Sequence, residues 1–253
     1  MKATYSDLKN KRVFISGGGS GIGASIVEHF CEQESEVFFV DINKKASNKL
    51  LSELKKKGLK KPTFIECSVL NTKKLQATIK KIISSKGSID VLVNNAANDD
   101  RHSTNDVDEK YWQNRIDLNL KHYFFAAQAV IKGMIKKKNG SIINLSSVSW
   151  ILGEGDKVVY ETAKSAAIGL TRSFAQEFGK YNIRSNSITP GNIATERQIK
   201  NWLTPKYKKF ILDNQALKRQ LKPYDVSRLV LFLASDQSSG CTKQNFVIDA
   251  GIT

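Results

Sequence analysis

The 253-residue sequence is poor in cysteine and histidine, with three of each. Cys31, Cys67 and Cys241 are far apart and odd in number, and they form no C-x-x-C pair. No histidine stands near them at the spacing of a metal site. These absences argue against a disulfide framework and a zinc centre, so we expect no metal.

Long apolar stretches are also absent. No apolar run approaches the roughly 20 residues of a membrane-spanning helix. The polar segment 1–10 leads directly into a strand-like run, which leaves no room for the apolar centre of a signal peptide. Hydrophobic residues make up 40% of the chain and charged residues 25%, as in ordinary globular proteins. We expect a cytoplasmic protein without a membrane partner.

Acidic residues are too few to balance the basic ones. Lys and Arg number 40 against 24 Asp and Glu, a formal net charge of +16. A nucleic-acid partner is one explanation, but 32 of the basic residues are Lys and only 8 are Arg, whose planar fork reads phosphates and bases. The lysines lie in short runs along the whole chain, such as 55–57 and 136–138, and form no single basic arm. We interpret the charge as a solvated surface and expect no nucleic-acid partner.

Short β-rich runs alternate with longer segments of helical periodicity, a pattern typical of βαβ units. The pattern predicts one α/β domain over residues 1–253. We expect it to be Rossmann-like, with a doubly wound, mostly parallel seven-stranded sheet and helices on both faces. The strands are predicted at 12–16, 37–40, 63–66, 89–94, 141–145, 183–188 and 246–249.

The helices are expected between these strands. Two shorter ones are predicted at about 22–33 and 46–57, and two long ones at about 111–137 and 159–178. Small and apolar residues recur at helical spacing on the last helix, which indicates a core or a subunit interface. The charged segment 196–222 breaks the rhythm, and we interpret it as a lid over a pocket.

A glycine-rich turn occupies residues 16–23, with the sequence Ser-Gly-Gly-Gly-Ser-Gly-Ile-Gly between the first strand and the first helix. Such glycines let the backbone approach a pyrophosphate, and the amides that open the helix bind the anion. Asp41 ends the second strand, where a carboxylate accepts hydrogen bonds from an adenosine ribose and repels a 2′-phosphate. The sequence therefore predicts NAD, although Lys44 and Lys45 nearby leave NADP open.

Tyr160 and Lys164 have the spacing Y-x-x-x-K on a predicted helix, so their side chains share one face. An ammonium beside a phenol favours the phenolate and lowers the tyrosine pKa, which suits a general base. Alone, the pair is far more typical of one side of an amphipathic helix than of a catalytic site. Ser147 supports the catalytic interpretation, because it follows the strand 141–145 and ligands bind at the carboxyl ends of parallel strands.

Further motif residues stand at the other strand ends. Asn94-Asn95-Ala96 closes one strand, Pro190-Gly191 follows another, and Asn119 lies in the first long helix. With the glycine turn and the Ser147, Tyr160 and Lys164 set, these residues in this order resemble the short-chain dehydrogenase/reductase family over nearly the whole chain.

The resemblance implies a role for each residue of a catalytic set. Tyr160 would be the base, and Lys164 would lower its pKa and hold the nicotinamide ribose. Ser147 would bond the reacting oxygen, and Asn119 would anchor a proton-relay water. Together these groups would stabilise the negative oxygen that develops as hydride leaves carbon.

The resemblance also implies cofactor contacts along the chain. Three positions depart from the family pattern: Ala97 and Lys243 stand where Gly is frequent, and Ser68 where an Asp commonly holds the adenine. The Ser68 departure puts the strength of the adenine contact in doubt. The implied cofactor set is Gly17, Ser20, Gly21, Ile22, Asp41, Ser68, Val69, Asn95, Ala96, Tyr160, Lys164, Ile193 and Thr195.

Local strings narrow the substrate. Residues 98–102, 149–150, 160–164 and 195–198 are similar to bacterial aldose 1-dehydrogenases that act on galactose, xylose or arabinose. The implied reaction is NAD-dependent oxidation of the anomeric carbon of a cyclic sugar to a lactone. A polyol needs convergent polar groups, and the expected lining residues are Asn98, Ser147, Ser149, Trp150, Glu154, Tyr160 and Asn192.

Alternatives stay open at this point. Residues 99–102 are as readily a salt-bridged loop or a subunit contact as part of a site. The enzyme could act on another alcohol or ketone, such as a 3-oxoacyl thioester, with the basic surface attracting an acidic carrier. The chain could also be a catalytically silent nucleotide-binding or nucleic-acid-associated protein. The resemblance further implies a homotetramer with interfaces formed by the two long helices.

Overall fold

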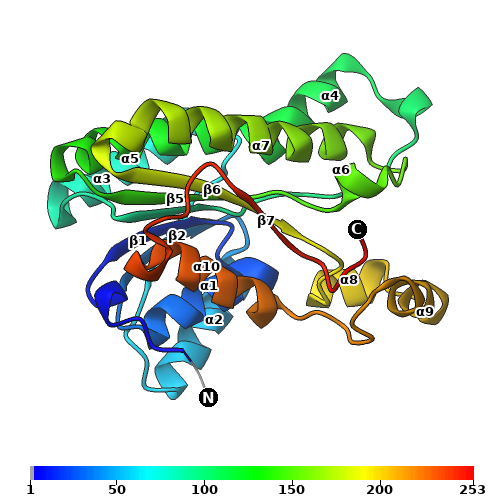
Figure 1. The fold of residues 1–253 in the computed structure, drawn as a ribbon, viewed down its shortest axis with the longest axis horizontal. Coiled ribbons are helices and arrows are strands. Elements are labelled where there is room, and N and C mark those ends of the chain that lie inside the picture. Colours follow the sequence, from blue (N-terminus) through cyan, green and yellow to red (C-terminus); the bar gives the residue numbers. More distant parts are fainter. Residues whose placement is uncertain (1–2) are drawn as a thin grey trace.

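In the computed structural model, which describes residues 3–253, strands and helices alternate in the predicted order (Figure 1). The strands are β1 (Arg12–Ser16), β2 (Glu36–Asp41), β3 (Thr63–Glu66), β4 (Val91–Asn94), β5 (Gly140–Leu145), β6 (Ile183–Pro190) and β7 (Asn245–Ile248). The helices are α1 (Gly21–Glu32), α2 (Lys44–Lys56), α3 (Thr72–Lys86), α4 (Glu109–Ile116), α5 (His122–Lys137), α6 (Ser149–Leu152), α7 (Val158–Phe178), α8 (Glu196–Asn201), α9 (Pro205–Asn214) and α10 (Pro223–Ala234). Within this part of the chain, no helix is both long enough and apolar enough to span a membrane.

The strands form one sheet in the order β3-β2-β1-β4-β5-β6-β7. Each neighbouring pair is parallel, so the sheet is parallel throughout. The chain builds outward from β1 to β3, then returns to add β4 on the other side of β1. The loops that follow β1 and β4 therefore run in opposite directions and open a crevice at the carboxyl edge. The predicted α/β fold class is confirmed.

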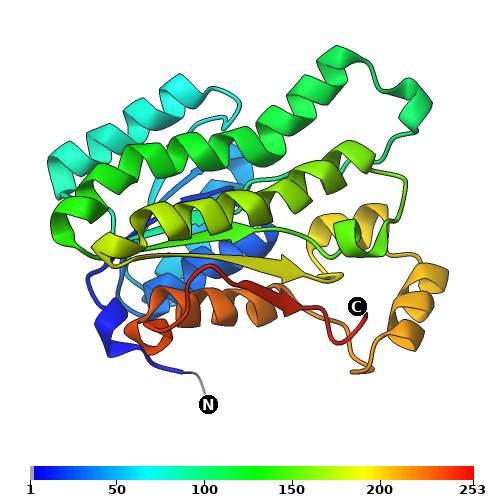
Figure 2. The same cartoon turned by 45° about the horizontal axis from the view of Figure 1, so that its top comes forward.

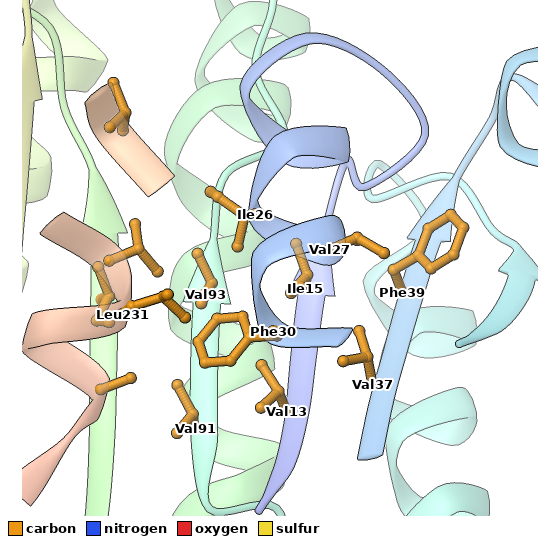
Figure 3. Packing of buried hydrophobic residues seen from close by; sticks show 14 of the residues in the cluster. Val13, Ile15, Ile26, Val27, Phe30, Val37, Phe39, Val91, Val93 and Leu231 are labelled. Carbon is orange, nitrogen blue, oxygen red and sulfur yellow. The ribbon is translucent and has the colours of Figure 1, made fainter. Parts of the chain in front are cut away.

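Helices cover both faces of the sheet, as Figures 1 and 2 show. Successive strand residues point to opposite faces. Val13 and Ile15 of β1 belong to the core under α1, α2 and α10, whereas Phe14 between them belongs to the core under α3, α5 and α7. In Figure 3, Phe30 of α1 packs over β1 and β4 beside Leu231 of α10. Because both faces are buried, the strands read as continuous apolar runs.

The predicted helix 111–137 is divided in two. A π-helical turn, Asp117–Lys121, joins α4 to α5 and holds the completely buried Asn119 at its centre. The Asn119 side chain donates to the Arg115 carbonyl at 2.9 Å and accepts from the Asn98 amide at 2.8 Å. Wide turns of this kind are frequent at functional sites. The apolar periodicity of the sequence continues through the turn, so it predicts one helix.

The segment 196–222 is mainly helical rather than irregular. It contains α8 and α9, and each helix begins at a threonine cap, Thr195 and Thr204. The segment leaves and rejoins the domain at one place, where Ile193 and Leu221 form an isolated parallel bridge. The two ends of the segment are therefore held together by this bridge. The movement of the segment as a lid stays a prediction.

Lys243 stands where the family pattern frequently has Gly, and its backbone conformation shows why Gly suits this position. It adopts φ 66° in the turn before β7, a left-handed conformation that favours glycine because a Cβ crowds the following carbonyl. The Lys243 amide donates to the Ser185 carbonyl of β6 at 2.8 Å, so the pairing of the last two strands sets this conformation. The departure affects local backbone energy and lies outside the residues that line the cavity described below.

Candidate active site

A cavity of about 1040 Å³ opens at the carboxyl ends of β1, β4, β5 and β6, where the strand order reverses. Ligands of doubly wound sheets bind at this place. All predicted cofactor residues except Lys164 line the cavity, and so do all predicted substrate residues except Trp150. Within residues 3–253, no group of three or more His, Cys, Asp or Glu side chains could hold a metal ion.

The glycine turn forms one end of the cavity. Gly17 has φ 69°, and a Cβ added there would lie 2.7 Å from the Ala96 Cα. A Cβ at Gly23 would lie 1.8 Å from the Gly17 carbonyl oxygen. Helix α1 begins at Gly21 with no side-chain cap and no acidic residue in its first turn. Its amides and positive dipole end can therefore meet a phosphate.

Asp41 borders the same end. One carboxylate oxygen accepts from the Gly19 amide and the other from the Asn43 amide, both at 2.8 Å. The carboxylate therefore holds the glycine turn and also places a negative charge at the cavity rim. Lys44 and Lys45, which left NADP open, do not line the cavity.

Ser16 and Asn95 join the glycine turn to the end of β4. The Asn95 side chain donates to the carbonyls of Ser16 at 3.1 Å and Gly17 at 2.8 Å. The Ser16 hydroxyl accepts from the amides of Asn95 at 3.0 Å and Ala96 at 3.2 Å. Ser16 was not predicted as a site residue, and its position as the last residue of β1 is the only sequence signal for it.

Ser147 and Tyr160 meet inside the cavity. A hydrogen bond joins their side chains, and the Ser147 hydroxyl also accepts from Ser149 at 3.0 Å. Burial raises the pKa of Tyr160, and the Asp99 carboxylate raises it further. The Ser147 hydrogen bond acts in the opposite direction because it stabilises the phenolate.

Lys164 is behind Tyr160 and outside the cavity lining. Its side chain is 1% exposed, and its ammonium donates to the Tyr123 hydroxyl and the Leu145 carbonyl, both at 2.8 Å. The ammonium is 5.6 Å from the centre of the Tyr160 ring. Burial lowers the pKa of Lys164 to about 7. Burial opposes the charged form of both Tyr160 and Lys164, and the lowering of the Tyr160 pKa by Lys164 stays a prediction.

Trp150 was expected in the pocket and is elsewhere. It follows Ser149 in α6, and successive helical residues point about 100° apart. Ser149 faces the cavity, so the indole of Trp150 does not. Leu152 of the same helix lines the cavity instead.

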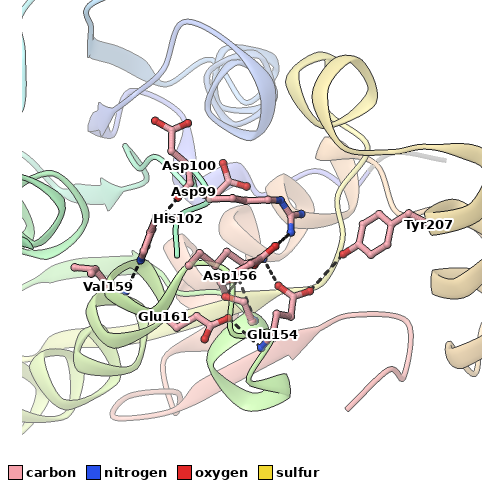
Figure 4. A network of polar contacts seen from close by, with 12 residues as sticks. Asp99, Asp100, His102, Glu154, Asp156, Val159, Glu161 and Tyr207 are labelled. Atoms are coloured by element: carbon pink, nitrogen blue, oxygen red, sulfur yellow. Dashed lines mark hydrogen bonds and ion pairs between the residues drawn. The ribbon is translucent and has the colours of Figure 1, made fainter. Parts of the chain in front are cut away.

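An ionic cluster, named here the Glu154 network, borders the substrate side (Figure 4). Lys157, 5% exposed, pairs with Glu154 and Asp156, and Asp156 also pairs with Arg101. Glu154 accepts from the Tyr207 hydroxyl of α9 at 3.3 Å. Burial opposes the charge of Lys157, but the hydrogen bond to Glu154 and the negative charges of Glu154 and Asp156 together outweigh burial and raise the Lys157 pKa. Lys157 is therefore an ammonium at neutral pH.

Helix α8 is tied to the loop after β4. Arg197 pairs with Asp100 at 2.7 Å and with Asp99 at 3.3 Å, and Gln198 donates to Asp99 at 2.6 Å. The Arg101 guanidinium stacks 4.7 Å from the centre of the Trp202 ring. The loop 99–102 is therefore salt-bridged within the chain, and Asp99 and Arg101 line the cavity as well.

Besides Ser16, two further buried residues at the site, Tyr123 and Lys157, were not predicted. Tyr123 follows Asn119 by four residues, which is the spacing of one turn of a regular α-helix. The π turn that contains Asn119 changes the relation between the two side chains, and the sequence does not indicate this turn. Lys157 is three residues before Tyr160, yet nothing distinguishes it from the other lysines in the sequence. Only the packing of the loop before α7 shows that it is buried.

Comparison with known proteins defines the class of this protein. A family model described as enoyl-(acyl carrier protein) reductase matches residues 17–253. D-Xylose 1-dehydrogenase of Caulobacter vibrioides is 46% identical over 249 residues, covering 98% of both chains. A protein of Rhizobium meliloti named "Probable galactose dehydrogenase" is 41% identical over 248 residues, covering 98% of this chain and 97% of its own.

A solved structure supports the same class of protein. A 3-oxoacyl-[acyl-carrier protein] reductase of Brucella melitensis with bound NAD has a TM-score of 0.88 and 29% identity, covering 98% of this chain and 93% of its own. The chain belongs to the short-chain dehydrogenase/reductase family, whose members use nicotinamide cofactors. It is an oxidoreductase, and its close relatives act on CH–OH groups.

We expect the substitution Lys157→Met to lower the free energy of unfolding by about 1–3 kcal/mol, because two carboxylates lose a buried cation. Urea denaturation measures the change. Lys209→Met is the matched control, since the Lys209–Asp213 pair is on the surface with Lys209 77% exposed. Its removal should change stability by less than about 0.5 kcal/mol. Equal losses in the two variants would show that the Glu154 network does not depend on the Lys157 charge.

Proposed function

We propose that the protein oxidises the anomeric carbon of an aldose to the lactone, with NAD as the hydride acceptor. The polar wall around Tyr160 is the observation that carries this proposal. Asn98, Ser149, Glu154 and Asn192 line the cavity with Tyr160. A sugar presents hydroxyls on successive carbons, and a site that hydrogen-bonds them discriminates against substrates that lack them.

The charges of this wall are balanced within the chain. Five cationic side chains line the cavity, and four of them are paired with a carboxylate: Arg101, Arg115, Lys157 and Arg197. No strong net charge of one sign is thus directed at the substrate, which suits a neutral molecule. The relatives named as xylose and galactose dehydrogenases support the same substrate class.

Tyr160 is the proposed base. Its oxygen takes the proton of the anomeric hydroxyl, and Ser147 orients that hydroxyl through its hydrogen-bonding position beside Tyr160. Bound NAD would accept the hydride from the same carbon. Lys164 and Asn119 lie on the side of Tyr160 away from the cavity. Lys164 supplies positive charge near the Tyr160 ring, and Asn119 bonds the π turn to the loop after β4.

The cofactor site supports NAD. The carboxylate of Asp41 stands at the cavity rim with both oxygens fixed by backbone amides, so it cannot swing away from a 2′-phosphate. Gly17, Gly21 and Ile22 would meet the pyrophosphate, while Ser68 and Val69 would border the adenine. Ile193 and Thr195 would hold the nicotinamide amide at the base of the segment 196–222.

A second function is the reduction of a 3-oxoacyl thioester. The Brucella melitensis neighbour bears that name, and the net charge of +16 would attract an acidic carrier protein. The densely polar wall favours the sugar, because an acyl chain makes no use of its donors and acceptors. The third alternative is a protein that binds a nucleotide without catalysis. The Ser147–Tyr160 pair is intact, so it gives this alternative no support.

We further propose a homotetramer, as the family resemblance implies. Phe124 of α5 is 43% exposed, and its ring centre lies 6.0 Å from that of the buried Phe174 of α7. The half-buried Phe178 lies 6.0 Å from Phe174. Aromatic side chains that are exposed on a monomer are enriched at subunit interfaces.

The substrate proposal is tested by following NADH absorbance with D-xylose, D-galactose and L-arabinose. We expect turnover with at least one of them and none with its methyl glycoside, whose anomeric oxygen carries no proton.

The rate should rise with pH above neutrality, because the raised Tyr160 pKa delays formation of the base. Tyr160→Phe should lower kcat by about 10²–10⁴-fold. Turnover of 3-oxoacyl thioesters alone would replace the sugar proposal, and NAD binding without any turnover would support the silent alternative.

The NAD preference is tested with Asp41→Asn. Loss of the negative charge should raise KM for NAD and lower KM for NADP, so that the NAD/NADP ratio of kcat/KM falls by about tenfold. Asp213→Asn removes a carboxylate from the surface of α9 and should leave the ratio unchanged. A wild-type enzyme that prefers NADP would contradict the assignment.

The assembly is tested by sedimentation equilibrium. We expect a mass four times that of the 28.2 kDa chain. Phe124→Glu places a charge on the aromatic surface and should yield smaller species. A wild-type protein that stays monomeric at micromolar concentration would refute the tetramer.

A further inference from the structure

Tyr123 of α5 is completely buried and contacts the ammonium of Lys164. The Tyr123 hydroxyl accepts from Lys164 at 2.8 Å and donates to the Leu145 carbonyl at 2.8 Å. Lys164 donates to the same carbonyl at 2.8 Å. The hydroxyl, the ammonium and the carbonyl thus form a closed triangle, which satisfies two of the three ammonium donors.

The surrounding fold leaves Tyr123 little freedom. Its ring packs edge-on against His122, with ring centres 4.6 Å apart and an interplanar angle of 88°. The Tyr123 backbone carbonyl accepts from the Asn94 side chain at 3.4 Å, and Asn94 also donates to Asn144 at 2.8 Å. Helix α5 is therefore fixed to β4 and β5 at this residue, so the hydroxyl has one position.

The charges around Lys164 explain why a fixed acceptor matters. Tyr160 faces it from its own helix, Tyr123 and His122 from α5, and Asp99 from the loop after β4. Burial and the nearby Lys164 lower the pKa of His122 to about 3, so His122 is neutral. Burial raises the pKa of Tyr123, so its hydroxyl stays protonated. Asp99 is the one carboxylate of this group, and it favours the ammonium form of Lys164.

We propose that Tyr123 is a positioning residue for the reaction, whose hydroxyl holds the Lys164 ammonium beside Tyr160 and keeps it protonated. The proposal rests on the proposed role of Tyr160 as base, and it does not depend on which alcohol is the substrate. A hydrogen bond to the charged form of a group favours that form. A protonated Lys164 at 5.6 Å stabilises the Tyr160 phenolate in this buried site, whereas a neutral one does not.

The substitution Tyr123→Phe removes the hydroxyl and keeps the ring. Lys164 then loses one of its two acceptors, so it should deprotonate at a lower pH and support the Tyr160 phenolate less. We expect the acid-side midpoint of the kcat–pH profile for alcohol oxidation to rise by about one pH unit. At neutral pH, kcat should fall by about tenfold while KM for substrate and NAD changes less than about twofold.

Tyr181→Phe is the matched control, because it removes a hydroxyl from the turn after α7, away from the cavity lining. It should leave the profile unchanged. Tyr123→Gln keeps an acceptor at this position and should recover part of the wild-type midpoint. A Tyr123→Phe profile that superimposes on that of the wild type would overturn the proposal. So would a uniform loss of rate at every pH with a lower Tm, which is the mark of a purely structural role.

A measurement without substrate separates this proposal from the sugar assignment. Tyrosine ionisation is followed by ultraviolet absorbance of the NAD-bound enzyme, and subtraction of the Tyr160→Phe titration isolates Tyr160. The isolated ionisation should move to higher pH in Tyr123→Phe. A shift without turnover of any sugar supports the role of Tyr123 and rejects the aldose. Sugar turnover without a shift supports the aldose and rejects the role of Tyr123.

Discussion

The site depends on the hydrogen bonds that join the ends of β1 and β4 where the strand order reverses. The two strands pair as far as Ser16 and Asn94, and the loops that follow them run in opposite directions, so side chains connect the two segments at the crevice. Ser16 and Asn95 make that connection from opposite sides, each bonding to the backbone of the other strand end. The glycine turn is held in this frame, with Asp41 fixing its outer side. The predicted cofactor residues, which are separated along the chain, can therefore form one surface.

Burial of charge is the second constraint. The proposed mechanism requires Tyr160 and Lys164 each to form an ion, and the surroundings of both oppose ionisation. Hydrogen bonds offset this cost at Tyr160 through Ser147 and at Lys164 through Tyr123 and Leu145. The proposed reactive pair is thus part of a longer buried chain of polar groups that crosses from α7 to α5 and β5. Its catalytic use depends on how those partners share protons.

Charged residues near the substrate side have a structural task as well. The Glu154 network and the Arg197 pairs connect α8 and α9 to the loops after β4 and before α7. The same carboxylates face the cavity, so a substrate that engages Glu154 or Asp99 competes with bonds that hold the segment 196–222. In the proposed function, we therefore expect substrate recognition and the position of this segment to be coupled.

The sequence by itself determined the parallel α/β fold, the glycine turn and the alignment of Ser147, Tyr160 and Lys164. These follow from local patterns: apolar runs of strand length, glycines where a backbone comes within contact distance, and one helical turn between two side chains. Helix and strand boundaries agreed within a few residues because caps and periodicity are also local. Ser68 and Asp41 were placed correctly at the cavity because residues at the carboxyl ends of parallel strands share one edge.

Tertiary structure alone decided the environment of each side chain. The π turn at Asn119 divides a helix whose apolar period is unbroken, and Trp150 is outside the lining of a cavity that Ser149 faces. Lys157 is buried, unlike most lysines of the chain. The partners of Lys164 come from α5 and β5, far from it in sequence. A pKa, a buried ion pair and a side-chain direction all depend on atoms brought together by packing, and no local pattern records them.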